Sequence, residues 1–136
     1  MKGGVIMRLN PDCIRDILLT AEENIQYKDN QLISMCYSNN PTNFERLKKY
    51  SNEEIRYHII QCGQHNFIQI SATTYETILI RDLTPLGHEF LTNIRSNTVW
   101  NKTISIANKL GSTSLDVLIK IATGVLTQMI NKQLGY

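Results

Sequence analysis

Apolar residues recur at helical spacing in five stretches of the chain, with polar residues between them. The pattern predicts helices over residues 11–25, 52–64, 85–95, 98–110 and 115–133. Four of them have a start signal typical of an N-cap, namely Asn10-Pro11, Ser51-Asn52-Glu53-Glu54, Thr84-Pro85, and Ser112 or Ser114. Ser96-Asn97 predicts a break or a bend between the third helix and the fourth. Two apolar segments, residues 67–72 and 77–83, are joined by four turn residues and predict a β-hairpin.

Residues 27–50 are rich in turn-forming side chains and predict little regular structure. A short strand is expected around Leu32–Cys36 or around Phe44–Leu47. The predicted order is therefore helix, loop or strand, capped helix, two-stranded ribbon and a helix that starts at Thr84-Pro85. This order predicts an α+β, mainly helical protein with a winged helix-turn-helix domain, a two-stranded wing and a C-terminal helical extension.

The expected division is a leader over residues 1–6, a winged-helix domain over 7–96 and C-terminal helices over 97–136. The leader is inferred from the codons of Lys2-Gly3-Gly4-Val5, which can form a purine-rich string like a bacterial ribosome-binding site. Such a string just upstream of Met7 predicts that Met7 is the natural start.

Composition places the 136-residue chain among ordinary globular proteins, with 42% hydrophobic and 19% charged residues. The formal net charge of +2 is too small to indicate a polyanionic partner by itself. Three scattered cysteines favour buried thiols in a reducing cytoplasm over a disulfide framework. No apolar run approaches the ~20 residues of a membrane span, so no membrane partner is expected.

Three stretches of the chain resemble an uncharacterised bacterial and prophage family, a domain of unknown function (DUF2513-like). They are Tyr50-Ser51-Asn52-Glu53-Glu54-Ile55-Arg56-Tyr57-His58, Leu83-Thr84-Pro85-Leu86-Gly87-His88-Glu89-Phe90-Leu91 and Ile94-Arg95-Ser96-Asn97-Thr98-Val99-Trp100-Asn101-Lys102. The resemblance covers most of the chain from Met7 onward. It implies a winged-helix fold in a phage or mobile-element setting, and it supplies no catalytic residues.

The capped helix over residues 52–64 is the candidate DNA-reading helix, with double-stranded DNA as the partner and transcriptional control as the role. Its outward polar side chains can bond base edges, and two lysines just upstream can bind phosphates. The predicted DNA-binding residues are Lys48, Lys49, Asn52, Arg56, Tyr57 and Gln64. Glu53 and Glu54 suit the positive end of the helix dipole but repel DNA, which leaves open a second hypothesis. In that hypothesis the winged helix is a protein-binding adaptor, with Tyr57 and Ile60 in the contact.

Other chemistries are disfavoured. His58, Cys62 and His65 have a spacing that can hold zinc, but the first two fall on the apolar stripe and are expected to be core residues. No phosphate loop, nucleophile motif or carboxylate cluster is present, so no enzyme activity, metal or cofactor is expected. The last helix has a wider apolar stripe than a lone surface helix needs, which predicts a homo-oligomer formed through it.

Overall fold

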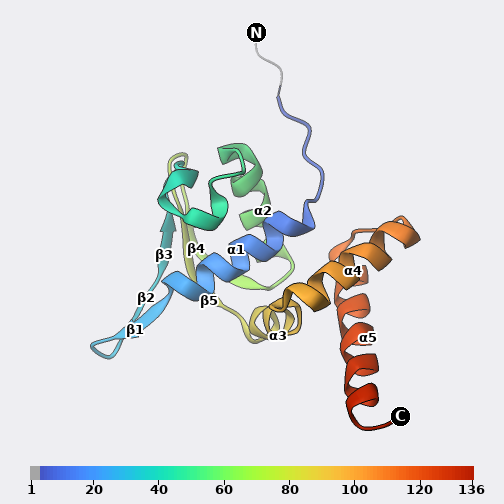
Figure 1. Cartoon of the computed structure of the whole chain (residues 1–136). Coiled ribbons are helices and arrows are strands. Elements are labelled where there is room, and N and C mark those ends of the chain that lie inside the picture. Colours follow the sequence, from blue (N-terminus) through green and yellow to red (C-terminus); the bar gives the residue numbers. More distant parts are fainter. Residues whose placement is uncertain (1–3) are drawn as a thin grey trace. The chain divides into compact units, whose positions relative to one another are not determined.

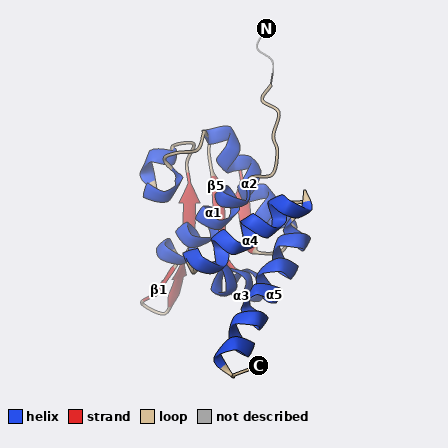
Figure 2. Ribbon diagram, turned by 45° about the vertical axis from the view of Figure 1, so that its right-hand side comes forward, coloured by secondary structure: helices blue, strands red, loops and turns tan. Residues whose placement is uncertain are grey.

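The computed structural model describes residues 4–136 and contains helices and small antiparallel sheets (Figures 1 and 2). The expected α+β, mainly helical class is confirmed. The chain divides into two compact units, residues 1–88 and 89–136, and the division falls within a helix. The sequence had placed the domain boundary after residue 96. The first three residues of the predicted leader lie outside the described part of the chain.

The first unit begins with a helix and ends with a hairpin that leads into a second helical segment. Its elements are α1 (Pro11–Asn24), β1 (Gln26–Lys28), β2 (Gln31–Ile33), β3 (Met35–Tyr37), η1 (Pro41–Asn43), η2 (Glu45–Leu47), α2 (Asn52–Gln64), β4 (Ile68–Thr73), β5 (Ile78–Leu83) and the start of α3 (Pro85–Ile94). The predicted helix and hairpin bounds agree with these to within one or two residues.

A three-stranded antiparallel sheet lies at the centre of this unit, in the order β3-β5-β4. β5 pairs with β3 through Met35↔Ile80 and Tyr37↔Ile78, and all four of these side chains are buried. β5 also pairs with β4, where the register shifts on both sides of Ile70. α1 contacts α2, η2 and β5, and α2 contacts β4. The helices and the sheet therefore share one apolar core.

Residues 26–33 form a hairpin that the sequence did not predict. β1 and β2 pair through Tyr27↔Leu32, and Asp29 and Asn30 form the turn with φ of 52° and 61°. Figure 1 shows this hairpin leaving the end of α1 and pointing away from the three-stranded sheet. The expected strand near residues 32–36 exists as β2 and β3, whereas the alternative strand over Phe44–Leu47 is wrong, because residues 45–47 form the 3₁₀ turn η2.

The second unit contains the remainder of α3, α4 (Asn97–Leu110) and α5 (Leu115–Gln133). Ser96 and Ser114 cap α4 and α5 by accepting hydrogen bonds from the backbone N–H groups of Val99 and Val117. Gly111 ends α4 with φ of 72°, a left-handed conformation that a glycine adopts without steric cost. α4 packs on α5, and the buried residues of α5 are Leu115, Leu118, Ala122 and Val125.

The turn between β5 and α3 brings two backbone segments unusually close. The Thr84 N–H donates to the Phe67 carbonyl at 3.0 Å, and the Thr84 hydroxyl donates to the Asn66 carbonyl. The Thr84 hydroxyl also caps α3 by accepting from the Gly87 N–H at 2.9 Å, as the sequence predicts for this N-cap. A Cβ on Gly87 would lie 1.9 Å from the Phe67 carbonyl oxygen, so only glycine fits there.

Across residues 4–136 no helix combines the length and the apolar character needed to cross a bilayer.

Candidate nucleic-acid interface

α2 begins after its N-cap Ser51, but only half of the predicted capping box is formed. The Ser51 hydroxyl accepts from the Glu54 N–H at 3.1 Å, which is the first half of the predicted capping box. The Glu54 carboxylate does not complete the box as predicted. It accepts from Asn10 Nδ2 at 2.8 Å, and Asn10 is the N-cap of α1. The start of α2 is therefore fastened to the start of α1.

His58 forms a second hydrogen-bonded connection between α1 and α2. Its ring is fully buried, Nε2 lies 2.8 Å from the Asn10 backbone nitrogen, and Nδ1 lies 2.7 Å from the Glu54 carbonyl oxygen. Because the Asn10 N–H can only donate, Nε2 must be the acceptor, and the proton is on Nδ1. The expectation that His58 is a core residue is confirmed, and both ring nitrogens are engaged within the protein.

Arg56 joins α2 to the turn of the β4–β5 hairpin. Its guanidinium donates to the Thr74 carbonyl at 2.7 Å and to Asn39 Oδ1 at 3.0 Å. Asn39, with φ of 35°, also donates from its side chain to the Tyr75 carbonyl at 3.0 Å. These three bonds hold the hairpin tip beside α2. The predicted base-reading side chain therefore has a structural role, with guanidinium N–H groups left over because only two bonds are made.

Asn52 is the next predicted contact residue, and it lies over the core of the sheet. Its side-chain oxygen accepts from the Tyr37 hydroxyl at 2.8 Å. Tyr37 is fully buried on β3, and this burial raises the pKa of its phenol to about 12, against a smaller lowering by the Arg56 charge. No sequence signal predicts this bond, because Tyr37 lies in the turn-rich stretch over residues 27–50.

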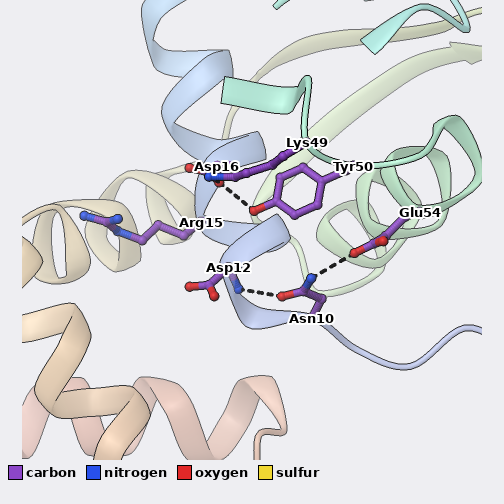
Figure 3. A pocket seen from close by; sticks show the side chains of 7 residues that line it. All are labelled: Asn10, Asp12, Arg15, Asp16, Lys49, Tyr50 and Glu54. Atoms are coloured by element: carbon purple, nitrogen blue, oxygen red, sulfur yellow. Dashed lines mark hydrogen bonds and ion pairs between the residues drawn. The ribbon is translucent and has the colours of Figure 1, made fainter. Parts of the chain in front are cut away.

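Lys48 and Lys49, the predicted phosphate contacts, each lie beside a carboxylate. Lys48 Nζ is 2.6 Å from Glu45 and forms an exposed ion pair. Lys49 Nζ is 3.1 Å from the Asp16 carboxylate of α1 and 5.5 Å from the centre of the Tyr50 ring. Asp16 Oδ2 also accepts a hydrogen bond from the Tyr50 hydroxyl, with an oxygen–oxygen distance of 2.6 Å (Figure 3). Part of the positive charge expected near α2 is thus neutralised within the molecule.

The Asp16–Tyr50 contact lies in a polar cavity of about 510 Å³ in the first unit. Its lining carries three carboxylates and two cationic side chains, and comprises Asn10, Asp12, Arg15, Asp16, Lys49, Tyr50 and Glu54 (Figure 3). Burial raises the pKa of the Tyr50 phenol, and its hydrogen bond to Asp16 raises it further. Burial also lowers the pKa of Arg15, which the neighbouring Asp16 charge partly offsets. Among the lining residues only Glu54 belongs to α2, and neither Arg56 nor Gln64 is among them.

The two buried phenols predict a loss of stability at alkaline pH. Both have a folded-state pKa above the ordinary value of 10.0, so the neutral phenol is favoured in the folded protein. Their contribution is complete below about pH 10 and falls as the pH rises, because the unfolded chain releases those protons first. We expect the urea midpoint to drop above about pH 10, and to drop less in Tyr37→Phe and Tyr50→Phe. An equal drop in these variants and the wild type would contradict the prediction.

The remaining predicted residues lie on α2, where Tyr57 is half-buried and Gln64 is exposed. Tyr57 makes an edge contact with the His58 ring, with ring centres 5.2 Å apart. The structure therefore brings four predicted residues onto one helix, Asn52, Arg56, Tyr57 and Gln64, whereas Lys49 belongs to the separate Asp16 cluster. Asn39, Tyr37 and Asp16 were missed because their roles depend on contacts that are distant in sequence.

Within residues 4–136, no group of three or more His, Cys, Asp or Glu side chains is arranged to hold a metal ion. Cys62 is fully buried, and this burial raises the pKa of its thiol far above the ordinary value. Both ring nitrogens of the neighbouring His58 are bonded to the backbone of Asn10 and Glu54.

The fold and this surface define an α+β, mainly helical protein with a polar helix face tied to a β-hairpin. Residues 8–114 match the family described as "Hypothetical protein (DUF2513)", and the chain belongs to this family, as its sequence resemblance indicated. It is also similar to a Haemophilus influenzae protein described as uncharacterized, with 30% identity over 128 residues that cover 91% of this chain and 99% of the relative. No solved structure matches the chain.

Proposed function

We propose that residues 10–83 form a winged helix and that the protein binds double-stranded DNA in transcriptional control, in a prophage or mobile-element setting. The observation that carries the proposal is the topology. A winged helix runs helix, strand, helix, helix, strand, strand, and its first strand pairs with its last. The order α1, β1, β2, β3, η1–η2, α2, β4, β5 with the sheet order β3-β5-β4 follows this plan, with the β1–β2 hairpin inserted after the first helix and two 3₁₀ turns in place of the second.

In this arrangement α2 is the helix that enters the major groove, and the β4–β5 hairpin is the wing. The bonds from Arg56 and Asn39 to the hairpin tip support the proposal, because they hold the helix and the wing as one surface before DNA arrives. Amide side chains at Asn52 and Gln64 are suited to adenine edges. A preorganised polar surface loses little conformational freedom on binding.

One observation favours the second candidate, a protein-binding adaptor that uses the same face. Residues 10–83 carry seven Lys and Arg against ten Asp and Glu, so the proposed winged helix is acidic. Glu53 is exposed at the start of α2, and Tyr75 at the wing tip is 92% exposed. An acidic unit attracts phosphates poorly, whereas an exposed tyrosine is a frequent anchor in protein interfaces.

Titration of the full chain with labelled random-sequence duplex DNA separates the two candidates. A DNA-binding protein should bind at low salt and lose affinity steeply as salt rises, because released counterions drive the non-specific component. Absence of binding at micromolar protein would overturn the proposal and leave the adaptor.

Gln64→Ala is the cleaner variant for base contacts in a selected site, because Arg56→Ala also releases the wing. We expect Gln64→Ala to weaken a selected site by about tenfold and random DNA hardly at all.

We further propose that α5 associates with α5 of a second copy, which would give the two-fold symmetry of dimers that bind operators. The buried residues of α5 end at Val125, yet the helix continues for eight residues. That end carries exposed apolar side chains at Met129, Ile130 and Leu134, the last two 55% and 64% exposed. Light scattering should give the dimer mass for the wild type and the monomer mass for Ile130→Asp. A monomeric wild type would contradict self-association.

A further inference from the structure

The outer face of α4 differs from every other exposed helix face in the described chain. Its exposed residues from Asn97 to Lys109 are all polar, and none is acidic: Asn97, Thr98, Asn101, Lys102, Ser105, Asn108 and Lys109. The opposite face is buried through Val99, Trp100, Thr103 and Ala107. α4 is capped at both ends and has 14 residues, so it is a regular helix about 21 Å long, and this polar face extends along nearly all of it.

Charge is distributed unevenly along the chain, and α4 lies in its most positive part. No acidic residue occurs between Glu89 and Asp116, whereas Arg95, Lys102 and Lys109 fall in that interval. Residues 89–136 carry five Lys and Arg against two Asp and Glu, so the net positive charge of the protein resides in the second unit. This is the reverse of the slightly acidic first unit.

We infer that the exposed face of α4 is a second contact with duplex DNA, in which Lys102 and Lys109 bind backbone phosphates. This inference rests on the proposed DNA binding and supplies the positive charge that residues 1–88 lack. Ser105 and Asn108 lie between the two lysines along the helix and provide hydrogen-bonding groups for sugar, phosphate or base edges. Most protein–DNA hydrogen bonds go to the backbone and come from such side chains.

The composition of the face favours DNA over a protein partner. Protein interfaces depend on apolar and aromatic anchors at their centre. The exposed positions of α4 from Asn97 to Lys109 offer none, and Ile104 and Ile106 are only partly exposed at the margins. Leu110, the last residue of α4, is 66% exposed but falls outside the stripe of polar residues by helical spacing. A regular helix with amides, hydroxyls and spaced lysines matches a phosphate-lined groove instead.

The test compares two full-length double variants that remove the same charge from different helices. Lys102→Gln with Lys109→Gln alters the α4 face, and Lys120→Gln with Lys132→Gln alters exposed lysines of α5. Binding to random-sequence duplex DNA is measured over a range of salt concentrations. The slope of log affinity against log salt is negative for a DNA-binding protein. We expect the α4 variant to reduce the magnitude of this slope by about 2, one for each lost phosphate contact, and the α5 variant to leave it near the wild-type value.

The outcomes separate the two ideas. Wild-type protein that does not bind DNA overturns both the proposed function and this inference. Tight binding of the wild type to single-stranded RNA but not to duplex DNA likewise overturns both. Wild-type binding to duplex DNA with equal slopes in the two variants overturns only the α4 contact. Circular dichroism confirms that each variant is folded, and surface lysine changes of this kind have little effect on stability.

Discussion

Gly87→Ala is expected to destabilise the first unit severely. The added Cβ would lie 1.9 Å from the Phe67 carbonyl oxygen and 2.8 Å from its carbon, both of them backbone atoms that cannot rotate away. Relief requires the start of α3 to move off the chain at Phe67, which breaks the Thr84–Phe67 bond of 3.0 Å. We expect a loss of about 3 kcal/mol in unfolding free energy, the upper end of overpacking costs, measured as a lower urea midpoint.

Gly124→Ala is the matched control, because it makes the same chemical change within a helix. A Cβ at Gly124 meets no atom within 4 Å in the described structure. Alanine should therefore stabilise α5 by about 0.5–1 kcal/mol through its lower conformational entropy in the unfolded chain. If Gly87→Ala unfolds at the wild-type midpoint, the close approach between Gly87 and Phe67 is not present in solution.

His58→Ala is the second change with a large expected effect. It removes a fully buried ring and leaves the Asn10 N–H without its acceptor, which lies 2.8 Å away in the wild type. The cavity and the unsatisfied donor together should cost about 3 kcal/mol. The same variant should loosen the start of α1, so amide exchange near Asn10 should accelerate along with the drop in urea midpoint.

His88→Ala gives the comparison for this variant, since His88 is exposed on α3. Surface changes of this type usually alter stability by less than about 0.5 kcal/mol. Equal midpoints for the His58 and His88 variants would show that the ring of His58 does not connect α2 to α1.

Local signals explain why the helices could be predicted from the sequence. Ser51, Thr84 and Ser114 each precede an apolar stripe, and each accepts the expected backbone N–H. Asn66, two residues after the end of α2, has φ of 61°, the left-handed conformation in which asparagine commonly stops a helix. Such signals act within four or five residues, so a single chain segment contains the information needed to recognise them.

The β1–β2 hairpin could not be predicted because it lacks the usual apolar pattern. Most of its residues are exposed, Tyr27 by 76%, and its strands have only three residues each. Its turn uses Asp29-Asn30, where the commoner hairpin signal has glycine in the second position. The 3₁₀ turn over residues 45–47 was missed for a related reason, since Phe44 and Leu47 fit a strand or a helical turn equally well.

The candidate site was predictable as a set of residue types and not as a set of contacts. Exposure of Gln64 follows from helical spacing alone. The attachment of Arg56 to Thr74 and Asn39, and of Lys49 to Asp16, joins residues 17 to 33 positions apart in the chain. Such pairings depend on the tertiary fold, and a helix period contains no information about them.

The attachment of Arg56 to the hairpin tip has a mechanical consequence. A ligand that takes the particular N–H now bonded to the Thr74 carbonyl must break that bond, so such engagement at the helix loosens the tip, and a partner that pulls the tip away frees this N–H. The two events are thermodynamically linked and must influence each other equally. A ligand bound to α2 at Arg56 would then change the mobility of the β4–β5 hairpin tip without touching it.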